Sequence, residues 1–171
     1  FRAIEEMLGR PESIAEDLGF LTPSVLKLLK DSGFPGMKVL QFAFDARESS
    51  NYLPHTYPAN CVVYTGTHDN DTTRGWYHEV GKYARDFAKE YMCKPRLDED
   101  SLAGDFICLA MGSVADLCVI PMQDYLGLGS EARINIPSTL GGNWAWRMKE
   151  GQFDEEMAGE ILRVTKLYGR I

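Results

Sequence analysis

The chain has 171 residues, of which 44% are hydrophobic, enough for one ordinary domain with an apolar core. Its 18 basic and 25 acidic residues give a net charge of -7, which argues against binding to nucleic acid or to an anionic membrane surface. We find no apolar run approaching the ~18 residues that a membrane span needs.

The four cysteines form no CxxC pair, and three of them lie in or beside apolar segments. This pattern is typical of buried, reduced thiols and not of disulfides or metal ligands, so we expect a cytoplasmic protein. The cysteines are Cys61, Cys93, Cys108 and Cys118.

The first part of the chain predicts two helices with a short strand between them. A helix is expected over residues 2–8 and a strand over residues 13–15. The segment TPSVLKLLKDSG predicts the second helix, because Thr22 is a favourable N-cap, Pro23 suits the first helical position and Gly33 is a common stop.

The middle of the chain predicts two further strands. MKVLQFAF, residues 37–44, is the second expected strand, and a polar loop with prolines and asparagines covers residues 45–60. CVVY, residues 61–64, is the third. A helical stretch is expected over residues 72–92, with a break near Gly81 because glycine is a poor helix former.

The last part predicts a helix over SLAGDFICLAMGS, residues 101–113, and a fourth strand over residues 117–122. A glycine-rich segment covers residues 127–146, and an amphipathic helix is expected over residues 154–168. Four steps of strand and helix are typical of an α/β protein with a parallel sheet, such as half of an eight-stranded barrel. An open, doubly wound sheet is the alternative.

Acidic residues and histidines gather at the carboxyl ends of the expected strands. Glu16 and Asp17 are adjacent, so in an extended segment their side chains point to opposite sides and only one can face a site. Asp45 follows the second strand, and His55 lies in the loop after it. An acidic turn and an ordinary surface histidine are the alternative interpretations.

The third strand runs into THDNDT, which contains His68 and Asp69. A metal centre would need two or three convergent ligands, and a serine hydrolase would need a nucleophile elbow such as GxSxG, which the sequence lacks. Asp71 and Thr72 fit the start of the following helix. Capping leaves His68 and Asp69 unexplained, and we expect no metal site.

The segment GLGSEA, residues 127–132, matches the GxGxxA pattern of dinucleotide-binding folds. Residues 121–124 separate it from the preceding strand, and GGNWAW follows where a helix is needed, so we expect no cofactor. Aromatic side chains accompany the polar loops, and their apolar faces suit sugar rings as well as a protein core. They are Tyr52, Tyr57, Trp76, Tyr125, Trp144 and Trp146.

Several long motifs follow one another along the chain. They are AEDLG at 15–19, GFPGMKVLQFAFD at 33–45, LPHTYP at 53–58, YTGTHDNDTTRGWY at 64–77, and PMQDYLGLGSEARINIP with GNWAWR within 121–147. Together they resemble the 4-α-glucanotransferases of glycoside hydrolase family 77, which include the amylomaltases or disproportionating enzymes. The resemblance implies a partial TIM (β/α)8 barrel, approximately strands 5 to 8 with flanking helices. It also implies retaining transfer of α-1,4-glucan segments between maltooligosaccharides, in starch and glycogen metabolism.

The same resemblance implies roles for individual side chains. Glu16 would be the general acid/base, Asp69 would stabilise the transition state, and His68 would contact the sugar at the cleavage subsite. Further contacts to substrate are expected from Asp45, His55 and Asn135.

The nucleophilic aspartate of this family lies in a motif of the type DHFRG on the fourth barrel strand, and this sequence contains no such motif. We therefore expect residues 1–171 to be the C-terminal part of a single catalytic barrel, without its N-terminal half and inactive alone. Exposed barrel edges would invite association with a second copy. A glucan-binding module without catalysis is the alternative function, and a barrel enzyme acting on something other than sugar is a third.

Overall fold

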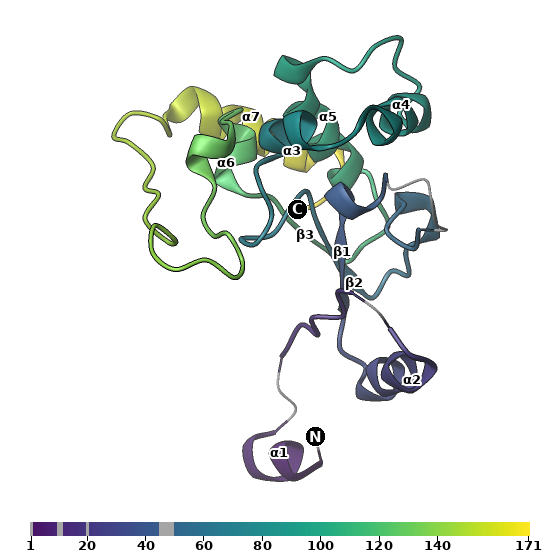
Figure 1. Cartoon of the computed structure of the whole chain (residues 1–171). Helices are drawn as coiled ribbons and strands as arrows, with labels where there is room; N and C mark the ends of the chain where they lie inside the picture. Colours follow the sequence, from purple (N-terminus) through teal and green to yellow (C-terminus); the bar gives the residue numbers. More distant parts are fainter. Residues whose placement is uncertain (1, 10–11, 20, 45–49) are drawn as a thin grey trace.

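The computed structural model describes residues 2–9, 12–19, 21–44 and 50–171. A small parallel sheet lies between the helices (Figure 1). The strands lie in the order β1-β2-β3, so each pairs with the next along the chain. Parallel neighbours need a crossover connection, and helices supply the one between β2 and β3. The expected parallel α/β arrangement is confirmed for these strands, which are β1 (Gly36–Val39), β2 (Cys61–Tyr64) and β3 (Leu117–Val119).

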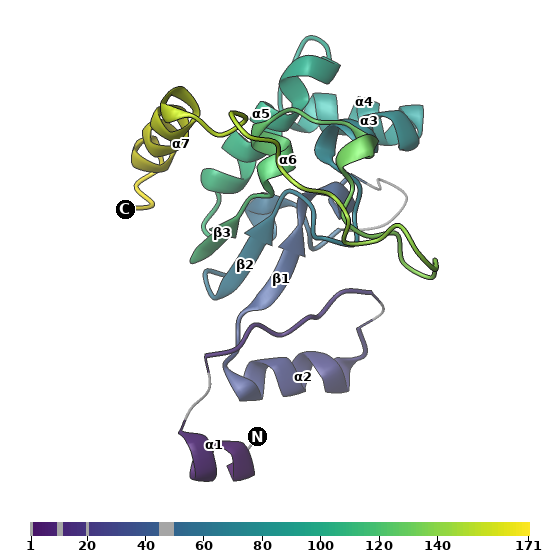
Figure 2. The ribbon, with the colours of Figure 1, turned by 90° about the vertical axis from the view of Figure 1, so that its left-hand side faces the viewer.

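Helices flank the sheet at its two ends. Figure 1 and Figure 2 show α3, α4, α5 and α6 gathered beyond the carboxyl ends of the strands and over one face, whereas α1 and α2 lie beyond their starting ends. The α-helices of the described residues are α1 (Arg2–Leu8), α2 (Pro23–Ser32), α3 (Thr73–Glu79), α4 (Lys82–Tyr91), α5 (Glu99–Met111), α6 (Met122–Tyr125) and α7 (Glu155–Leu167).

The helix boundaries that rest on capping residues are confirmed. Thr22 accepts a hydrogen bond from a backbone N–H in the first turn of α2, and the helix ends at Gly33, whose φ of 68° lies in the left-handed region. Thr72 caps α3 in the same way. The break expected near Gly81 separates α3 from α4. Asp98 caps α5, which starts two residues before the predicted helix.

The strand predicted over residues 13–15 does not form. Ala15 makes one isolated parallel bridge to Gly36, beside β1. Next to this bridge, the carboxylate of Asp17 accepts the backbone N–H of Met37 at 2.6 Å. The segment thus runs next to β1 and is joined to it by one backbone bridge and by the Asp17 side chain.

Two other strands are shorter than predicted. β1 ends at Val39, and the next residues form a 3-10 turn, η1 (Leu40–Phe42), in place of a strand reaching residue 44. The apolar run continues because these side chains enter the core, and hydrophobicity alone does not distinguish a strand from a buried turn. β3 ends at Val119 and not at residue 122, because Pro121 has no N–H for the ladder and instead starts α6.

The main core lies between the sheet and α3, α4 and α5. Its centre is a cluster of aromatic rings from Phe44, Trp76 and Phe106, whose centroids are 5.2 to 6.0 Å apart in tilted pairs. Buried aromatic pairs in such arrangements favour this packing by about 1 kcal/mol beyond the burial of their surface. The core therefore fixes α3, the helix that begins directly after the polar THDNDT segment.

The opposite face of β3 is open, since Leu117 and Val119 are 48% and 40% exposed.

The burial of the cysteines differs from the prediction. All four are free thiols, but only Cys61 is buried, whereas Cys93 and Cys108 are exposed. Their neighbours are apolar in sequence, yet Cys108 lies on the outer side of α5 and Cys93 follows the end of α4.

None of the helices in the described part of the chain has the length and apolarity that crossing a bilayer requires.

Candidate active site

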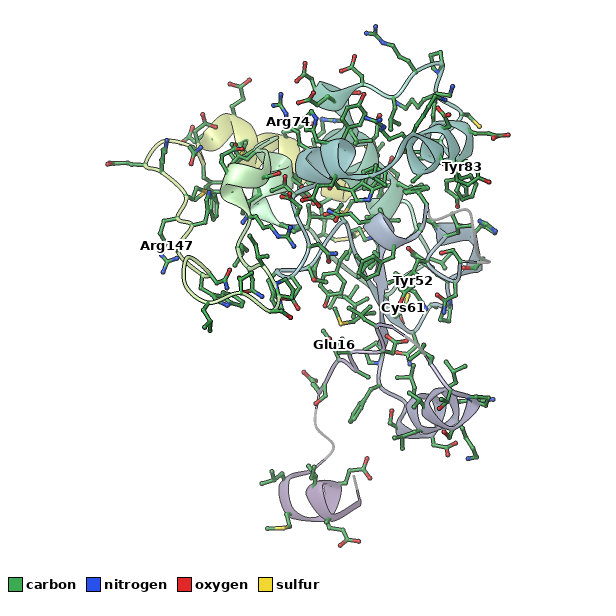
Figure 3. The ribbon with its side chains drawn as sticks, viewed as in Figure 1. Glu16, Tyr52, Cys61, Arg74, Tyr83 and Arg147 are labelled. Atoms are coloured by element: carbon green, nitrogen blue, oxygen red, sulfur yellow. The ribbon has the colours of Figure 1, made fainter. Side chains whose placement is uncertain are left out.

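Glu16, His68 and Asp69 line one open cavity of about 570 Å³ at the carboxyl ends of the strands. Its walls also include the aromatic rings of Phe42 and Tyr52. Figure 3 labels Glu16, on the segment beside β1, and Tyr52, on the loop before β2. Residues that lie more than fifty positions apart in the chain thus meet at one surface, and they combine carboxylates, an imidazole and apolar rings.

Glu16 and Asp17 point to opposite sides of their segment, as predicted. Glu16 is exposed and faces the cavity, whereas Asp17 is buried and binds the backbone N–H of Met37. A side chain at Gly36 would collide with the Asp17 carboxylate, which lies 2.7 Å from the position of a Cβ atom. Asp17 is therefore a structural residue, and Glu16 is the one available for chemistry.

The Asp69 carboxylate is held from two sides. The side-chain amide of Asn135 donates a hydrogen bond to Asp69 Oδ1 at 2.6 Å, and His68 Nε2 lies 3.4 Å from the same oxygen. Arg133 donates to the backbone carbonyl of Asp69 at 2.9 Å. Among the described residues no hydrogen bond involves Oδ2, so Oδ1 is the oxygen that these contacts hold in place.

His68 lies between Asp69 and an aromatic ring. The centroid of its imidazole is 5.0 Å from that of Trp144, with the rings tilted by 37°. Trp144 has a φ of 60°, a left-handed conformation that tryptophan rarely adopts. Its backbone N–H donates to the carbonyl of Ile134 at 2.7 Å, which closes the glycine-rich segment into a loop beside the site.

The turn that presents His68 and Asp69 is closed by Asn70, a residue without an assigned role in the sequence. The side-chain oxygen of Asn70 accepts hydrogen bonds from the backbone N–H of Thr67 at 2.9 Å and from its hydroxyl at 2.8 Å. Side-chain-to-backbone bonds of this kind stabilise tight turns. Asn70 therefore fixes the loop, and the two residues inside it remain available.

Asp71 and Thr72 have the structural roles that their sequence positions predict. Thr72 caps α3, and Asp71 is buried with its carboxylate accepting the N–H of Thr72 at 2.7 Å and the hydroxyl of Ser130 at 2.6 Å. A side chain at Gly75 would collide with this carboxylate, so glycine is required in the first turn of α3.

Asp124 was not predicted as a site residue, yet it links three elements behind the site. Its buried carboxylate accepts hydrogen bonds from the hydroxyl of Thr65 at 2.5 Å and from the N–H and hydroxyl of Thr73 at 2.8 and 2.9 Å. Burial raises the pKa of Asp124, and these hydrogen bonds oppose the rise. Its position after β3, in PMQD, follows the same rule of polar residues at strand ends that identified Asp69.

The other predicted substrate contacts lie in different places. Asn135 is part of the site through its bond to Asp69. His55 lies on the 3-10 turn η2 (Pro54–Thr56), where its Nδ1 is 3.1 Å from the hydroxyl of Tyr91, and it is not among the residues that line the cavity. Asp45 lies outside the described residues.

The two motifs weighed as metal or cofactor sites have local explanations. Within the described ranges, no three His, Cys, Asp or Glu side chains gather as a metal-binding group. GLGSEA is a loop followed by the 3-10 turn η3 (Ser130–Ala132), in which the Glu131 carboxylate accepts the N–H of Gly129 at 3.0 Å. No phosphate-binding helix begins there.

Comparison with known proteins gives one consistent result. The family model described as 4-alpha-glucanotransferase matches residues 1–153. The 4-alpha-glucanotransferase of Clostridium butyricum is 50% identical over 171 residues, which is 99% of this chain and 35% of that protein. The chloroplastic/amyloplastic 4-alpha-glucanotransferase of Arabidopsis thaliana is 45% identical over 100% of this chain and 30% of its own length.

A solved structure is similar over the same region. The amylomaltase from Streptococcus agalactiae in complex with acarbose matches with a TM-score of 0.89 and 34% identity, over 98% of this chain and 34% of that one. The chain thus spans about a third of the length of the relatives it matches.

Proposed function

Because the chain belongs to the 4-alpha-glucanotransferase family, we propose that the full-length protein carrying it transfers α-1,4-glucan segments between maltooligosaccharides with retention of configuration. The observation that carries the proposal is the shared cavity of Glu16, His68 and Asp69. A pair of carboxylates beside apolar rings provides acid/base chemistry together with surfaces for sugar rings. The substrates would be the glucans of starch and glycogen metabolism.

Glu16 acts in this proposal as the general acid and then the base. It protonates the glycosidic oxygen of the leaving chain while a second carboxylate, about 5 to 5.5 Å away, attacks the anomeric carbon. It then deprotonates the 4-hydroxyl of an acceptor glucan, which attacks the covalent intermediate and forms a new α-1,4 bond. The attacking carboxylate belongs to the DHFRG-type motif, which the 171 residues do not contain, so the chain alone is expected to be inactive.

Asp69 stabilises the transition state in this proposal. Its Oδ1 is held by Asn135, so the carboxylate is oriented before substrate binds. It therefore does not need to reorient when positive charge develops on the sugar. His68 lies beside it and offers a donor to a sugar hydroxyl, with Trp144 behind the imidazole. Asp45 and His55 are proposed as further substrate contacts on the strength of the family resemblance.

The fold proposed for the full-length protein is a TIM (β/α)8 barrel in which residues 13–15, β1, β2 and β3 correspond to strands 5 to 8. The bridge between Ala15 and Gly36 and the parallel order of β1, β2 and β3 support this assignment. Residues 1–171 would then be the C-terminal part of one catalytic barrel. A cytoplasmic location is supported by four free thiols.

The test uses the full-length protein and maltotriose. Glu16→Gln should lower the rate of disproportionation by about 10²-fold or more, because general acid–base catalysis contributes at least that factor. Affinity for acarbose, measured by titration calorimetry, should remain within about twofold of that of the unaltered protein, since the amide is nearly isosteric.

A matched control is Glu12→Gln, which alters an exposed glutamate four residues earlier and should leave the rate unchanged. Near-normal turnover by Glu16→Gln would refute the assignment of the acid/base. Glucan binding by the unaltered protein without any turnover would instead favour a binding module.

A further inference from the structure

Arg133 joins two backbone segments of the proposed active site. Its Nε donates a hydrogen bond to the carbonyl of Asn135 at 3.0 Å, and its Nη2 donates to the carbonyl of Asp69 at 2.9 Å. The side chain is 19% exposed, and Arg133 is not among the described residues that line the cavity at Glu16. Arg133 is therefore placed to act on the backbone of the site and not on a substrate.

The two carbonyls belong to the same residues that form the bond holding the Asp69 carboxylate. The side-chain amide of Asn135 donates to Asp69 Oδ1 at 2.6 Å, so the three residues form a closed ring of three hydrogen bonds. A guanidinium is planar, and its N–H groups point in fixed directions. Arg133 therefore sets the separation of the two backbones, and with it the direction of the bond from Asn135 to Asp69.

The third arm of the guanidinium has a weaker partner. Nη1 of Arg133 lies 3.7 Å from Oε1 of Glu79, the last residue of α3, whose side chain is 63% exposed. An ion pair of this length and exposure contributes little to stability. The bonds to the two carbonyls, and not the charge of Glu79, therefore define what Arg133 does.

The segment that carries Arg133 is also attached at its start. The hydroxyl of Ser130 donates to the buried carboxylate of Asp71 at 2.6 Å, and the buried amide of Gln123 donates to the carbonyl of Ala132 at 3.3 Å. Both bonds remain when the side chain of Arg133 is changed. The segment should then stay attached to the turn, while the geometry between Asn135 and Asp69 loosens.

We propose that Arg133 is a positioning residue for the glucan transfer reaction, which acts by keeping the Asp69 carboxylate aligned through Asn135 and through the backbone of the turn. The inference rests on the proposed function and deepens it, because it assigns the alignment of Asp69 to a side chain that does not line the cavity. The property that matters is the fork of the guanidinium, which a lysine ammonium lacks although it carries the same charge.

The test is a double-mutant cycle in the full-length protein with maltotriose as substrate. Arg133→Lys should lower kcat by about tenfold and leave KM within about twofold, because the charge stays and the alignment is lost. Asn135→Ala disturbs the same carboxylate, so the double variant should also lose about tenfold, whereas independent sites would lose about a hundredfold. Titration calorimetry with acarbose counts the binding sites per chain, and kcat is expressed per site so that unfolded protein does not contribute.

Two controls separate alignment from charge and from general disturbance. Glu79→Gln removes the ion-pair partner of Arg133 and should keep kcat unchanged. Arg85→Lys alters a half-buried arginine on α4 that donates to the carbonyl of Tyr77, and it should also keep kcat unchanged.

The outcomes distinguish this inference from the function on which it rests. A normal kcat for Arg133→Lys, a hundredfold loss in the double variant, or an equal loss in Glu79→Gln would overturn the role of Arg133 and leave the proposed function standing. If the unaltered protein binds acarbose but does not convert maltotriose, the proposed function fails and the role of Arg133 fails with it. Equal losses of about tenfold in both single variants and in the double variant support the inference.

Discussion

Removing the Asp124 side chain should destabilise the folded protein and loosen the turn that carries Asp69. In Asp124→Ala the backbone N–H of Thr73 loses its acceptor, which costs about 1 to 3 kcal/mol for a buried donor. The hydroxyls of Thr65 and Thr73 lose a partner as well, at about 0.5 to 1.5 kcal/mol each if they rotate to new acceptors. We therefore expect the free energy of unfolding to fall by about 3 kcal/mol.

Asp124→Asn separates the hydrogen bonds from the charge. The amide oxygen can keep the bond to the Thr73 N–H, and the two hydroxyls can rotate to accept from the amide nitrogen. Because the folded chain raises the pKa of Asp124, ionisation of this carboxyl opposes folding, and the cost appears as pH rises from about 4 through the raised pKa. The stability of Asp124→Asn relative to the unaltered protein should therefore increase from acid to neutral pH.

The assay is urea unfolding of the full-length protein, followed by tryptophan fluorescence at several pH values. The exposed aspartate Asp116 provides the control, and Asp116→Ala should unfold at the same urea concentration as the unaltered protein. An unchanged midpoint for Asp124→Ala would contradict the role of the buried carboxylate. A difference between Asp124→Asn and the unaltered protein that is constant with pH would contradict the sign of the pKa argument.

Three further predictions concern the site, the C-terminus and the open face. Asn135→Ala removes the 2.6 Å bond to Asp69, so kcat on maltotriose should fall about tenfold with little change in KM, and an unchanged kcat would count against orientation of Asp69. Arg170 donates to four carbonyl oxygens at the end of α5, and Arg170→Met should lower the free energy of unfolding by about 2 kcal/mol, whereas Arg163→Met, on the exposed side of α7, should not. The 171-residue chain alone should self-associate through the exposed apolar face of β3 and not disproportionate maltotriose; a monomer in sedimentation velocity, or turnover, would refute this.

Local rules predicted much of the fold, and they failed where distant residues decided the outcome. The ends of α2 and the start of α3 followed from Thr22, Gly33 and Thr72, because a cap acts within one turn of its helix. The ends of the strands did not. β1 stops at Val39 because the following apolar residues turn into a core built from α3 and α5, which the local sequence does not reveal.

The site was predictable to a similar extent. Alternation along an extended segment correctly separated Glu16 from Asp17. The contact of Asn135 with Asp69 joins residues 66 positions apart, so no local pattern contains it. The family resemblance led us to expect Asn135 as a substrate contact, not as a partner of Asp69. The role of Asp124 was missed for the same reason. Its hydrogen-bond donors, Thr65 and Thr73, are distant in the sequence and lie beside it only in the folded chain.

The two acidic corners of the cavity have similarly fixed backbones but differ at the carboxylate, and this difference argues for distinct roles of Glu16 and Asp69. At each corner a neighbouring polar residue fixes the backbone: Asp17 binds β1, and Asn70 closes the turn after β2. Asp69 is in addition oriented by a side chain, whereas no hydrogen bond of the described residues reaches the Glu16 carboxylate. A group that stabilises charge at a fixed place gains from being held. A group that gives a proton to one oxygen and takes a proton from another needs a fixed backbone and a carboxyl that can move, and among the described residues Glu16 fits this requirement.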